Sequence, residues 1–325
     1  MLICVTGATG FVGNHLCFQL LKLNYKIVAP VRKIREDKII LNKNIKYIQI
    51  ECFENYSKWQ TILKNIDCVI HCAAKNNSTI KKKDDFSSYS KINTQFTIDL
   101  AKHAANVGVK KFIFLSSIKV NGENNLKESS FKYFDSPNPQ DYYSISKWKA
   151  EIELRKLSSI VDLKLVIIRP PLVYGPKVEG NFLKLLNIIF YFPIIPNVRK
   201  NFLRSYVSID NLISFIIHSI KHPKSANKTF LISDGQDISF QSLIKILSKK
   251  MNKKVFFFTI PNFFIDFFCK FKNLKKLISK LFCSMRIDIF YNYDLLGWKP
   301  VYNLDEELTK MVKWYLAERN HDKKN

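Results

Sequence analysis

Carboxylates are the scarce group in this sequence. The 325 residues contain 27 Asp and Glu against 52 Lys and Arg, which gives a net charge of +25. Arginine is also rare, since 44 of the 52 basic residues are lysines. A basic protein invites a nucleic-acid or anionic-membrane interpretation, but arginine is the residue that reads bases and phosphates with two-pronged geometry. We therefore expect no nucleic-acid partner and a solvated, lysine-rich surface.

Paired cysteines and long hydrophobic runs are missing as well. The seven cysteines are odd in number, form no Cys-x-x-Cys pair and have no His at ligand spacing, so we expect free buried thiols and no metal site. The N-terminus lacks the basic and long apolar regions of a secretory signal. The uncharged, strongly apolar stretch 185–198 is interrupted by two prolines and is too short to span a bilayer. These features predict a cytoplasmic protein.

Short apolar runs alternate with helical segments through the first half of the chain. This alternation is typical of a parallel sheet covered by helices on both faces, a doubly wound α/β fold. Strands are expected at 2–5, 26–31, 46–50, 67–71, 111–116 and 163–168, and helices at 11–23, 91–107 and 143–157.

The second half of the chain does not continue this alternation of apolar runs and helical segments. Five prolines between 170 and 196 interrupt it, a strand-like run follows at 230–232, and 240–250 is helical in pattern. We expect residues 1–170 to form a dinucleotide-binding domain with returning segments at about 204–234. Residues 171–325 would form mainly a smaller α/β substrate lobe.

A glycine-rich loop lies between the first strand and the first helix. The sequence TGATGFVG starts at Thr6, and its Gly7, Gly10 and Gly13 allow a tight turn and close approach to a pyrophosphate. The helix N-terminus then offers free N–H groups to the phosphates. The expected cofactor contacts come from the residues of this loop: Gly7, Thr9, Gly10, Phe11, Val12 and Gly13.

The end of the second strand bears on the choice of dinucleotide. An NAD site usually has a carboxylate about 20 residues after the loop, to bind the ribose 2′-hydroxyl. This chain has Arg32 and Lys33 there, and a cation would attract a 2′-phosphate. The sequence therefore favours NADP(H), with NAD(H) as the alternative.

A candidate proton-transfer group lies further along the chain. Tyr143 and Lys147 are four residues apart, which places them on one helix face. A nearby ammonium would lower the pKa of a phenol that otherwise ionises near 10. Ser116 and Ser117 end the preceding strand, where doubly wound sheets carry their sites.

The order of these motifs resembles the extended short-chain dehydrogenase/reductase family of nucleotide-sugar epimerases, dehydratases and reductases. The matching segments are TGATGFVG, HCAA at 71–74, LSSIKVNG at 115–122, YSISK at 143–147 and RPPLVYGP at 169–176. The resemblance runs over essentially the whole chain and implies a Rossmann-type domain with a nucleotide-sugar lobe. Asn121 departs from the family pattern, which usually has Tyr there.

The resemblance also implies roles for individual residues. Ser117, Tyr143 and Lys147 would be catalytic, and Tyr143, Lys147 and Ala73 would contact the cofactor. Ser116, Ser117 and Arg204 would bind the nucleotide-sugar, and Arg204 would contact the UDP diphosphate. Asn181 and Arg286 lie near places that contact the nucleotide in relatives and are further candidates. A homodimer is a further expectation from the family.

The two residues after Ser117 narrow the choice of reaction. Sugar 4,6-dehydratases of the family carry an Asp-Glu pair there, whereas this chain has Ile118 and Lys119. Chemistry at sugar carbon 4 remains. The resemblance favours NAD(P)H-dependent reduction of a UDP-4-keto-6-deoxy-hexosamine for surface-polysaccharide (O-antigen) precursors. An NAD-dependent 4-epimerase of UDP-glucose or UDP-N-acetylglucosamine is the alternative.

A binding role is the competing interpretation. Residues 250–286 carry nine basic residues, one acidic residue and nine phenylalanines. Such a stretch is suited to weak peripheral contact with the inner face of an anionic membrane, although packing of the phenylalanines within the lobe explains the same pattern. A non-catalytic nucleotide-sugar-binding protein stays open too.

Overall fold

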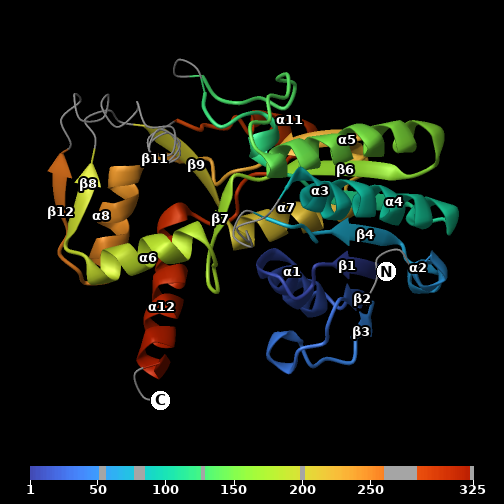
Figure 1. Cartoon of the computed structure of the whole chain (residues 1–325), viewed down its shortest axis with the longest axis horizontal. Coiled ribbons are helices and arrows are strands. Elements are labelled where there is room, and N and C mark those ends of the chain that lie inside the picture. The colour runs from blue at the N-terminus through green and yellow to red at the C-terminus, as the bar shows by residue number, and fades with distance from the viewer. Residues whose placement is uncertain (51–55, 77–84, 126–128, 198–201, 260–283, 323–325) are drawn as a thin grey trace.

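The computed structural model describes residues 1–50, 56–76, 85–125, 129–197, 202–259 and 284–322. The chain forms two unequal parts, with the larger parallel sheet at one end and a smaller lobe at the other (Figure 1).

Seven parallel strands make the larger sheet, in the order β10-β6-β5-β4-β1-β2-β3. The order reverses after β3, so that β4 lies on the other side of β1, as in a doubly wound sheet. Its strands are β1 (Leu2–Thr6), β2 (Lys26–Val31), β3 (Ile45–Gln49), β4 (Cys68–His71), β5 (Lys111–Leu115), β6 (Lys164–Arg169) and β10 (Lys228–Leu231).

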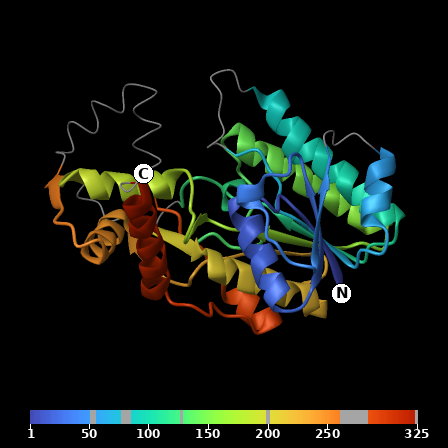
Figure 2. The ribbon, with the colours of Figure 1, turned by 90° about the horizontal axis from the view of Figure 1, so that it is seen from below.

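Helices cover both faces of this sheet, as Figure 2 shows. Side chains alternate between the faces, so Ile3 and Val5 pack on one side and Cys4 on the other. The first face is covered by α1 (Phe11–Lys22), α7 (Ile209–Lys221) and α11 (Phe290–Leu296). The second face is covered by α2 (Tyr56–Leu63), α4 (Phe96–Asn106) and α5 (Tyr142–Ile160).

The smaller lobe contains two further sheets and its own apolar core. One sheet has the order β11-β9-β7 and the other pairs β12 with β8. The core joins Tyr174, Phe182 and Met311. The strands are β7 (Leu172–Tyr174), β8 (Ile194–Asn197), β9 (Leu203–Ser208), β11 (Asp237–Ser239) and β12 (Phe256–Thr259), and the helices are α6 (Asn181–Tyr191), α8 (Phe240–Lys250) and α12 (Leu304–Asp322).

The fold class expected from the sequence is confirmed, and one helix differs. The segment expected as a single helix over 91–107 begins as α3 (Phe86–Tyr89) and a π-helical turn (η3, Ser90–Gln95) before α4. The wider turn accompanies full burial of Asn93, which hydrogen-bonds both Lys75 and Ser146. A polar side chain buried this way needs such partners.

The cysteines that the structure describes are free. Cys4, Cys17 and Cys68 are buried and Cys72 is half-buried, and burial raises the pKa of each thiol. The other three cysteines and most of the basic, phenylalanine-rich stretch at 250–286 lie outside the described residues. No helix in the described part of the chain is long and apolar enough to span a bilayer.

Candidate active site

The glycine loop turns directly from β1 into α1. Gly7 has a φ of +72°, and a Cβ there would lie 2.7 Å from the backbone nitrogen of Ala73. A Cβ on Gly13 would collide with the carbonyl oxygen of Gly7. Gly7 and Gly13 are therefore required by internal packing.

Gly10, the second glycine of the loop, lies in different surroundings from Gly7 and Gly13. It is exposed and is the N-cap of α1, and a Cβ there would have only the Gly7 carbonyl within 4 Å. No acidic residue occupies the first turn of α1, so the helix N-terminus keeps its positive end. Thr9, Phe11 and Val12, each half-buried, surround this position. The bare backbone at Gly10 fits a dinucleotide pyrophosphate.

His71 ties β1 to β4 beneath this loop. Its Nδ1 lies 2.7 Å from Thr6 Oγ1 and its Nε2 2.9 Å from Thr97 Oγ1. The Thr97 hydroxyl donates to the Asn93 carbonyl, so it accepts from Nε2–H and the Thr6 hydroxyl donates to Nδ1. Burial, with Lys147 nearby, holds the pKa of His71 well below its usual range, so the imidazole stays neutral.

Ser117, Tyr143 and Lys147 meet at the carboxyl end of β5. Tyr143 is in the first turn of α5, and its phenol is hydrogen-bonded to the Ser117 side chain. Lys147 is 1% exposed. Its Nζ donates to the Leu115 carbonyl at 2.8 Å and lies 4.5 Å from the centre of the Phe114 ring. A hydroxyl, a phenol and a cation thus face the same strand end.

The pKa values of this group differ from the expectation. Burial raises the pKa of Tyr143 to about 12, and the Asp141 charge adds to the rise, while the Ser117 hydrogen bond opposes it. Burial lowers the pKa of Lys147 to about 8. The prediction that Lys147 lowers the phenol pKa is wrong for the chain alone, because burial and the Asp141 charge raise this pKa and the Lys147 Nζ is directed at the Leu115 carbonyl.

Lys119 connects the segment after Ser117 to the start of α5. Its Nζ lies 2.7 Å from Asp141 Oδ2 and 3.1 Å from Glu123 Oε1. Asp141 caps α5 through a reciprocal pair of hydrogen bonds with Ser144. Burial would raise the pKa of Asp141, but Lys119 and the Ser144 bonds lower it to about 2. The ion pair therefore fixes the helix end that carries Tyr143.

Ser116 points into a buried ionic network rather than toward Tyr143. Its hydroxyl donates to Glu151 Oε1 at 2.6 Å, and Glu151 is completely buried. Arg169 donates to both Glu151 oxygens and, through Nη1, to Asn121 Oδ1 at 2.8 Å. Asn121 thus has a structural partner at the position where the family usually has Tyr. A substrate contact by Ser116 stays a prediction that these contacts do not favour.

Three of the expected nucleotide-sugar residues lie in the smaller lobe. Arg204 is half-buried on β9, and its backbone pairs with Met285. Arg286 is adjacent, and its Nε lies 2.9 Å from Asp237 Oδ2, so it forms an ion pair. Asn181 is exposed at the start of α6. The bridge between Met285 and Arg204 thus brings Arg286 next to β9, while Asn181 lies on a separate helix.

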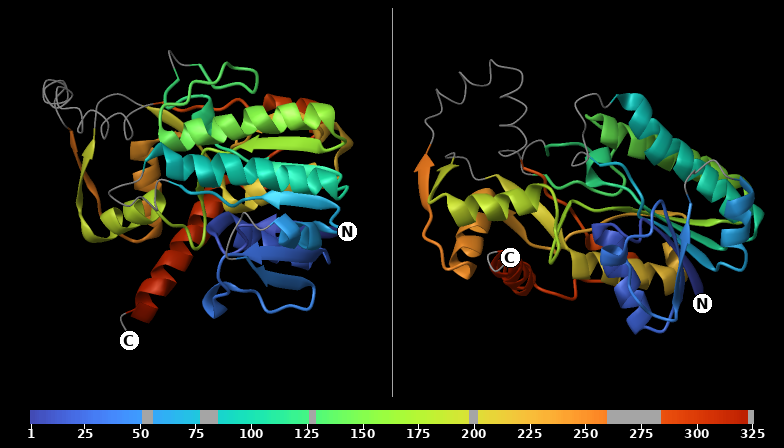
Figure 3. Two further views of the ribbon diagram at one scale, coloured as in Figure 1. Left: turned by 45° about the vertical axis from the view of Figure 1, so that its right-hand side comes forward. Right: turned by 60° about the horizontal axis from the view of Figure 1, so that its bottom comes forward.

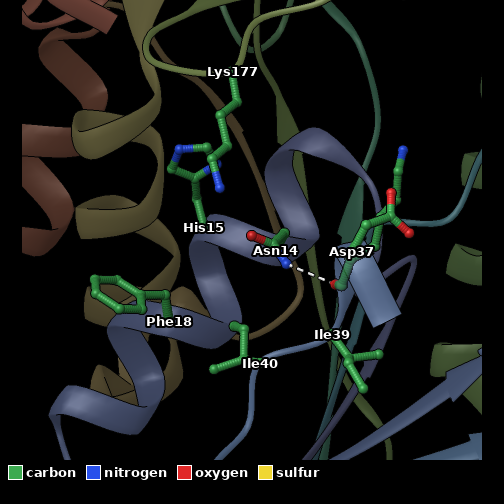
Figure 4. A pocket seen from close by; sticks show the side chains of 8 residues that line it. Asn14, His15, Phe18, Asp37, Ile39, Ile40 and Lys177 are labelled. Carbon is green, nitrogen blue, oxygen red and sulfur yellow. Dashed lines mark hydrogen bonds between the residues drawn. The ribbon is translucent and has the colours of Figure 1, made fainter. Parts of the chain in front are cut away.

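A cavity of about 400 Å³ lies beside α1, outside the predicted residues. Figure 4 shows Asn14 of α1 pointing toward the segment after β2 and His15 beside Lys177, and Phe18 also lines the cavity. Asn14 Nδ2 donates to the Lys38 carbonyl and anchors that segment to the helix. Arg32, one residue past β2, is exposed and is not part of the lining. The cavity contains no group from the Ser117–Tyr143 pair.

Sequence reasoning missed the supporting contacts. The pairs Lys119–Asp141 and Glu151–Arg169 join segments that are separated in the chain, so no local sequence pattern predicts these ion pairs. One signal was available, because an Asp three residues before Ser144 is typical of a helix N-cap.

The comparisons with known proteins identify the family of this chain. Residues 3–233 match the NAD dependent epimerase/dehydratase family. The chain belongs to this family. It is 35% identical, over 98% of its length, to the UDP-glucose 4-epimerase of Vibrio cholerae, of which it covers 96%. It is therefore a nucleotide-sugar-modifying, NAD-dependent enzyme of the epimerase/dehydratase family.

Two solved structures of family members have the same fold. The UDP-glucuronic acid 4-epimerase of Bacillus cereus in complex with NAD has a TM-score of 0.80 at 23% identity, covering 98% of this chain and 99% of that one. The UDP-glucose 4-epimerase of Thermotoga maritima with UDP-glucose also has a TM-score of 0.80, at 22% identity, with coverage of 98% and 100%.

Proposed function

We propose that this protein interconverts the carbon-4 epimers of a UDP-hexose, UDP-glucose or UDP-N-acetylglucosamine, with NAD. The observation that carries the proposal is the 35% identity to a UDP-glucose 4-epimerase across nearly the whole chain. The cluster of Ser117, Tyr143 and Lys147 supports it, because proton transfer at a single sugar oxygen is what such an epimerase needs. The sequence favoured a reductase, and the named relatives support the alternative instead.

In this proposal the 4-hydroxyl of the sugar lies between Ser117 and Tyr143. Tyr143 takes the hydroxyl proton as carbon 4 is oxidised and returns it as the keto group is reduced from the other face. Ser117 donates a hydrogen bond to the same oxygen and orients it. A bound NAD would supply reversible hydride transfer at carbon 4. Lys147 supplies positive charge beside the phenol and binds the adjacent ribose.

The residues after Ser117 do not suit elimination of water. Ile118 is 2% exposed and packs in an apolar cluster, and Lys119 is committed to Asp141 and Glu123. A 4,6-dehydratase needs a general acid and base at this point. These side chains favour chemistry confined to carbon 4.

A 4-keto reductase is the second candidate, and two observations favour it. The phenol pKa of about 12 makes Tyr143 a proton donor in the chain alone, which suits reduction of a ketone. Exposed Arg32 after β2 suits a 2′-phosphate and therefore NADP(H). The substrate would be a UDP-4-keto-6-deoxy-hexosamine. In both candidates Arg204 would bind the UDP diphosphate.

Retained cofactor and substrate turnover separate the candidates. The purified protein is denatured and the released nucleotide identified, and native protein is then incubated with UDP-glucose and with UDP-N-acetylglucosamine. The epimerase proposal expects stoichiometric NAD and formation of the carbon-4 epimer by NMR. Loss of NADPH with a UDP-4-keto-6-deoxy-hexosamine, without epimer formation, would establish the reductase. UDP-sugar binding without turnover of either kind would contradict both enzymes.

A further inference from the structure

The two-stranded sheet of the smaller lobe has one apolar face directed outward. β8 and β12 pair in parallel, with Phe256 opposite Ile194 and Phe258 opposite Pro196. Partners in register share a face. Ile194, Phe256 and Phe258 are 63%, 65% and 61% exposed. These three residues and Pro196, which is also exposed, are named the distal face.

The opposite side of the same sheet is packed inward. Ile195 is 3% exposed, and Phe257 packs with it in the lobe core. The alternation therefore separates a buried side from an exposed side that is just as apolar. An exposed strand surface in a water-soluble domain normally carries polar residues. The distal face is apolar instead, and no apolar surface among the described residues packs against it.

Further apolar side chains extend the distal face. Tyr191 and Phe192, at the end of α6 and just before β8, are 57% and 59% exposed. Figure 3 shows β8 and β12 at the extremity of the lobe, far from the large sheet. Single exposed apolar residues are ordinary, whereas a contiguous group marks an interaction surface.

The two chain segments that form the distal face carry charge of one sign. Residues 181–197 and 240–259 contain six lysines and no Asp or Glu. Lys184, Lys245, Lys249, Lys253 and Lys254 are exposed, and Lys250 forms an ion pair with Asp305. A second copy of this surface would bring lysines against lysines. Anionic lipid headgroups would instead attract each exposed lysine, and aromatic side chains partition to the membrane interface.

We propose that the distal face docks on the surface of an anionic lipid bilayer. Phe256, Phe258 and Ile194 would enter the headgroup region, while Lys253 and Lys254 contact lipid phosphates. The large sheet, at the other end of the molecule, would stay in water (Figure 1). The proposal is independent of the reaction that the active site performs.

Flotation of the protein with lipid vesicles tests whether the apolar side chains of the distal face bind the bilayer. Vesicles of phosphatidylcholine alone are compared with vesicles containing 30% phosphatidylglycerol. We expect flotation with the anionic vesicles only, and a partition coefficient lowered about tenfold or more in the double variant Phe256→Ser, Phe258→Ser. Phe290→Ser is the matched control, because Phe290 is 67% exposed on α11, away from the distal face. Circular dichroism and turnover check that each variant folds.

The contribution of the lysines beside the distal face is tested in the same flotation assay. The double variant Lys253→Gln, Lys254→Gln should float less, and its remaining binding should lose salt dependence. The pair Lys26→Gln, Lys228→Gln, exposed at the amino ends of β2 and β10, should float like the parent protein. Any of four results would overturn the proposal: no flotation, equal flotation with neutral vesicles, unchanged flotation of the Phe256/Phe258 variant, or a dimer by light scattering that this variant dissociates.

Discussion

At the scale of single residues, burial decides how the two central side chains ionise. The phenol of Tyr143 has a pKa of about 12 and the ammonium of Lys147 a pKa of about 8, so burial moves both toward their neutral forms. At neutral pH the phenol is protonated and most of Lys147 is charged. The positive ring of a bound oxidised nicotinamide would favour the phenolate, because an opposite charge nearby lowers a phenol pKa.

Replacing Tyr143 removes the proposed proton-transfer group. Tyr143→Phe should retain the dinucleotide and lower kcat by about 10²-fold or more, as expected for loss of a general acid–base residue. Tyr142→Phe is the matched control, since Tyr142 is the neighbouring residue and is 53% exposed. Epimer formation by NMR measures the outcome. A Tyr143→Phe enzyme that turns over like the Tyr142→Phe enzyme would remove Tyr143 from the mechanism.

Arg32 is the residue that bears on the dinucleotide. If its guanidinium faces a 2′-phosphate, Arg32→Ala should weaken NADPH binding about tenfold and leave NADH binding unchanged, because one charge-assisted hydrogen bond is lost. Fluorescence titration with both nucleotides measures this. Arg35→Ala, a nearby exposed arginine, is the control. Equal loss of both affinities would assign Arg32 to a general contact instead.

At the scale of elements, local patterns predicted most strands and helices. Apolar runs such as 2–5 and 163–168 become buried strands because a sheet covered on both faces needs them. The properties of the active site were harder to predict than these elements. Tyr143 and Lys147 were predictable from helical spacing. Their pKa values were not, because both depend on burial and that of Tyr143 also depends on Asp141. The π-helical turn before α4 depends on the tertiary contacts of Asn93 and was missed for the same reason.

Lys119 couples two elements, the turn after Ser117 and the start of α5. Lys119→Met leaves the Asp141 carboxylate without its nearest cation, so the phenolate of Tyr143 becomes less favourable and its pKa rises further. The pH at which kcat for epimerisation is half-maximal should move upward by about one unit. Lys156→Met, which breaks an exposed pair with Glu153 on the same helix, should leave the profile in place. A uniform loss at all pH values would indicate a structural role only.

Arg169 holds β6 to α5 through a fully buried charge. Arg169→Met leaves Glu151 without its main partner and should lower the free energy of unfolding by about 3 kcal/mol. Arg155→Met removes the more exposed partner of the same carboxylate, 39% exposed, and should cost less than about 1 kcal/mol. Urea unfolding followed by circular dichroism compares the two. Similar losses of unfolding free energy in the two variants would show that the buried ion pair stabilises the fold no more than the exposed one.

At the scale of the whole molecule, the proposed function divides cofactor and substrate binding between the two parts. The large sheet presents the glycine loop and the Ser117–Tyr143 pair, and the smaller lobe presents Arg204 and Arg286. β6 leads through Arg169 directly into β7 of the lobe, so the strand that ends beside the active site also begins the lobe. Both ligands of the proposed reaction are anions, and the excess of lysine creates a field that attracts them.

The same excess of charge should destabilise the folded chain. A net charge of +25 repels itself most strongly in the compact state, and added salt screens that repulsion. Raising NaCl from 20 to 300 mM should therefore raise Tm by about 2 °C or more in differential scanning calorimetry. Replacing exposed Lys26, Lys43 and Lys228 by Glu lowers the net charge by six. That variant should have a higher Tm at low salt and a smaller response to NaCl. A Tm that falls with salt would mean that ion pairs, rather than repulsion among lysines, dominate the electrostatics of this fold.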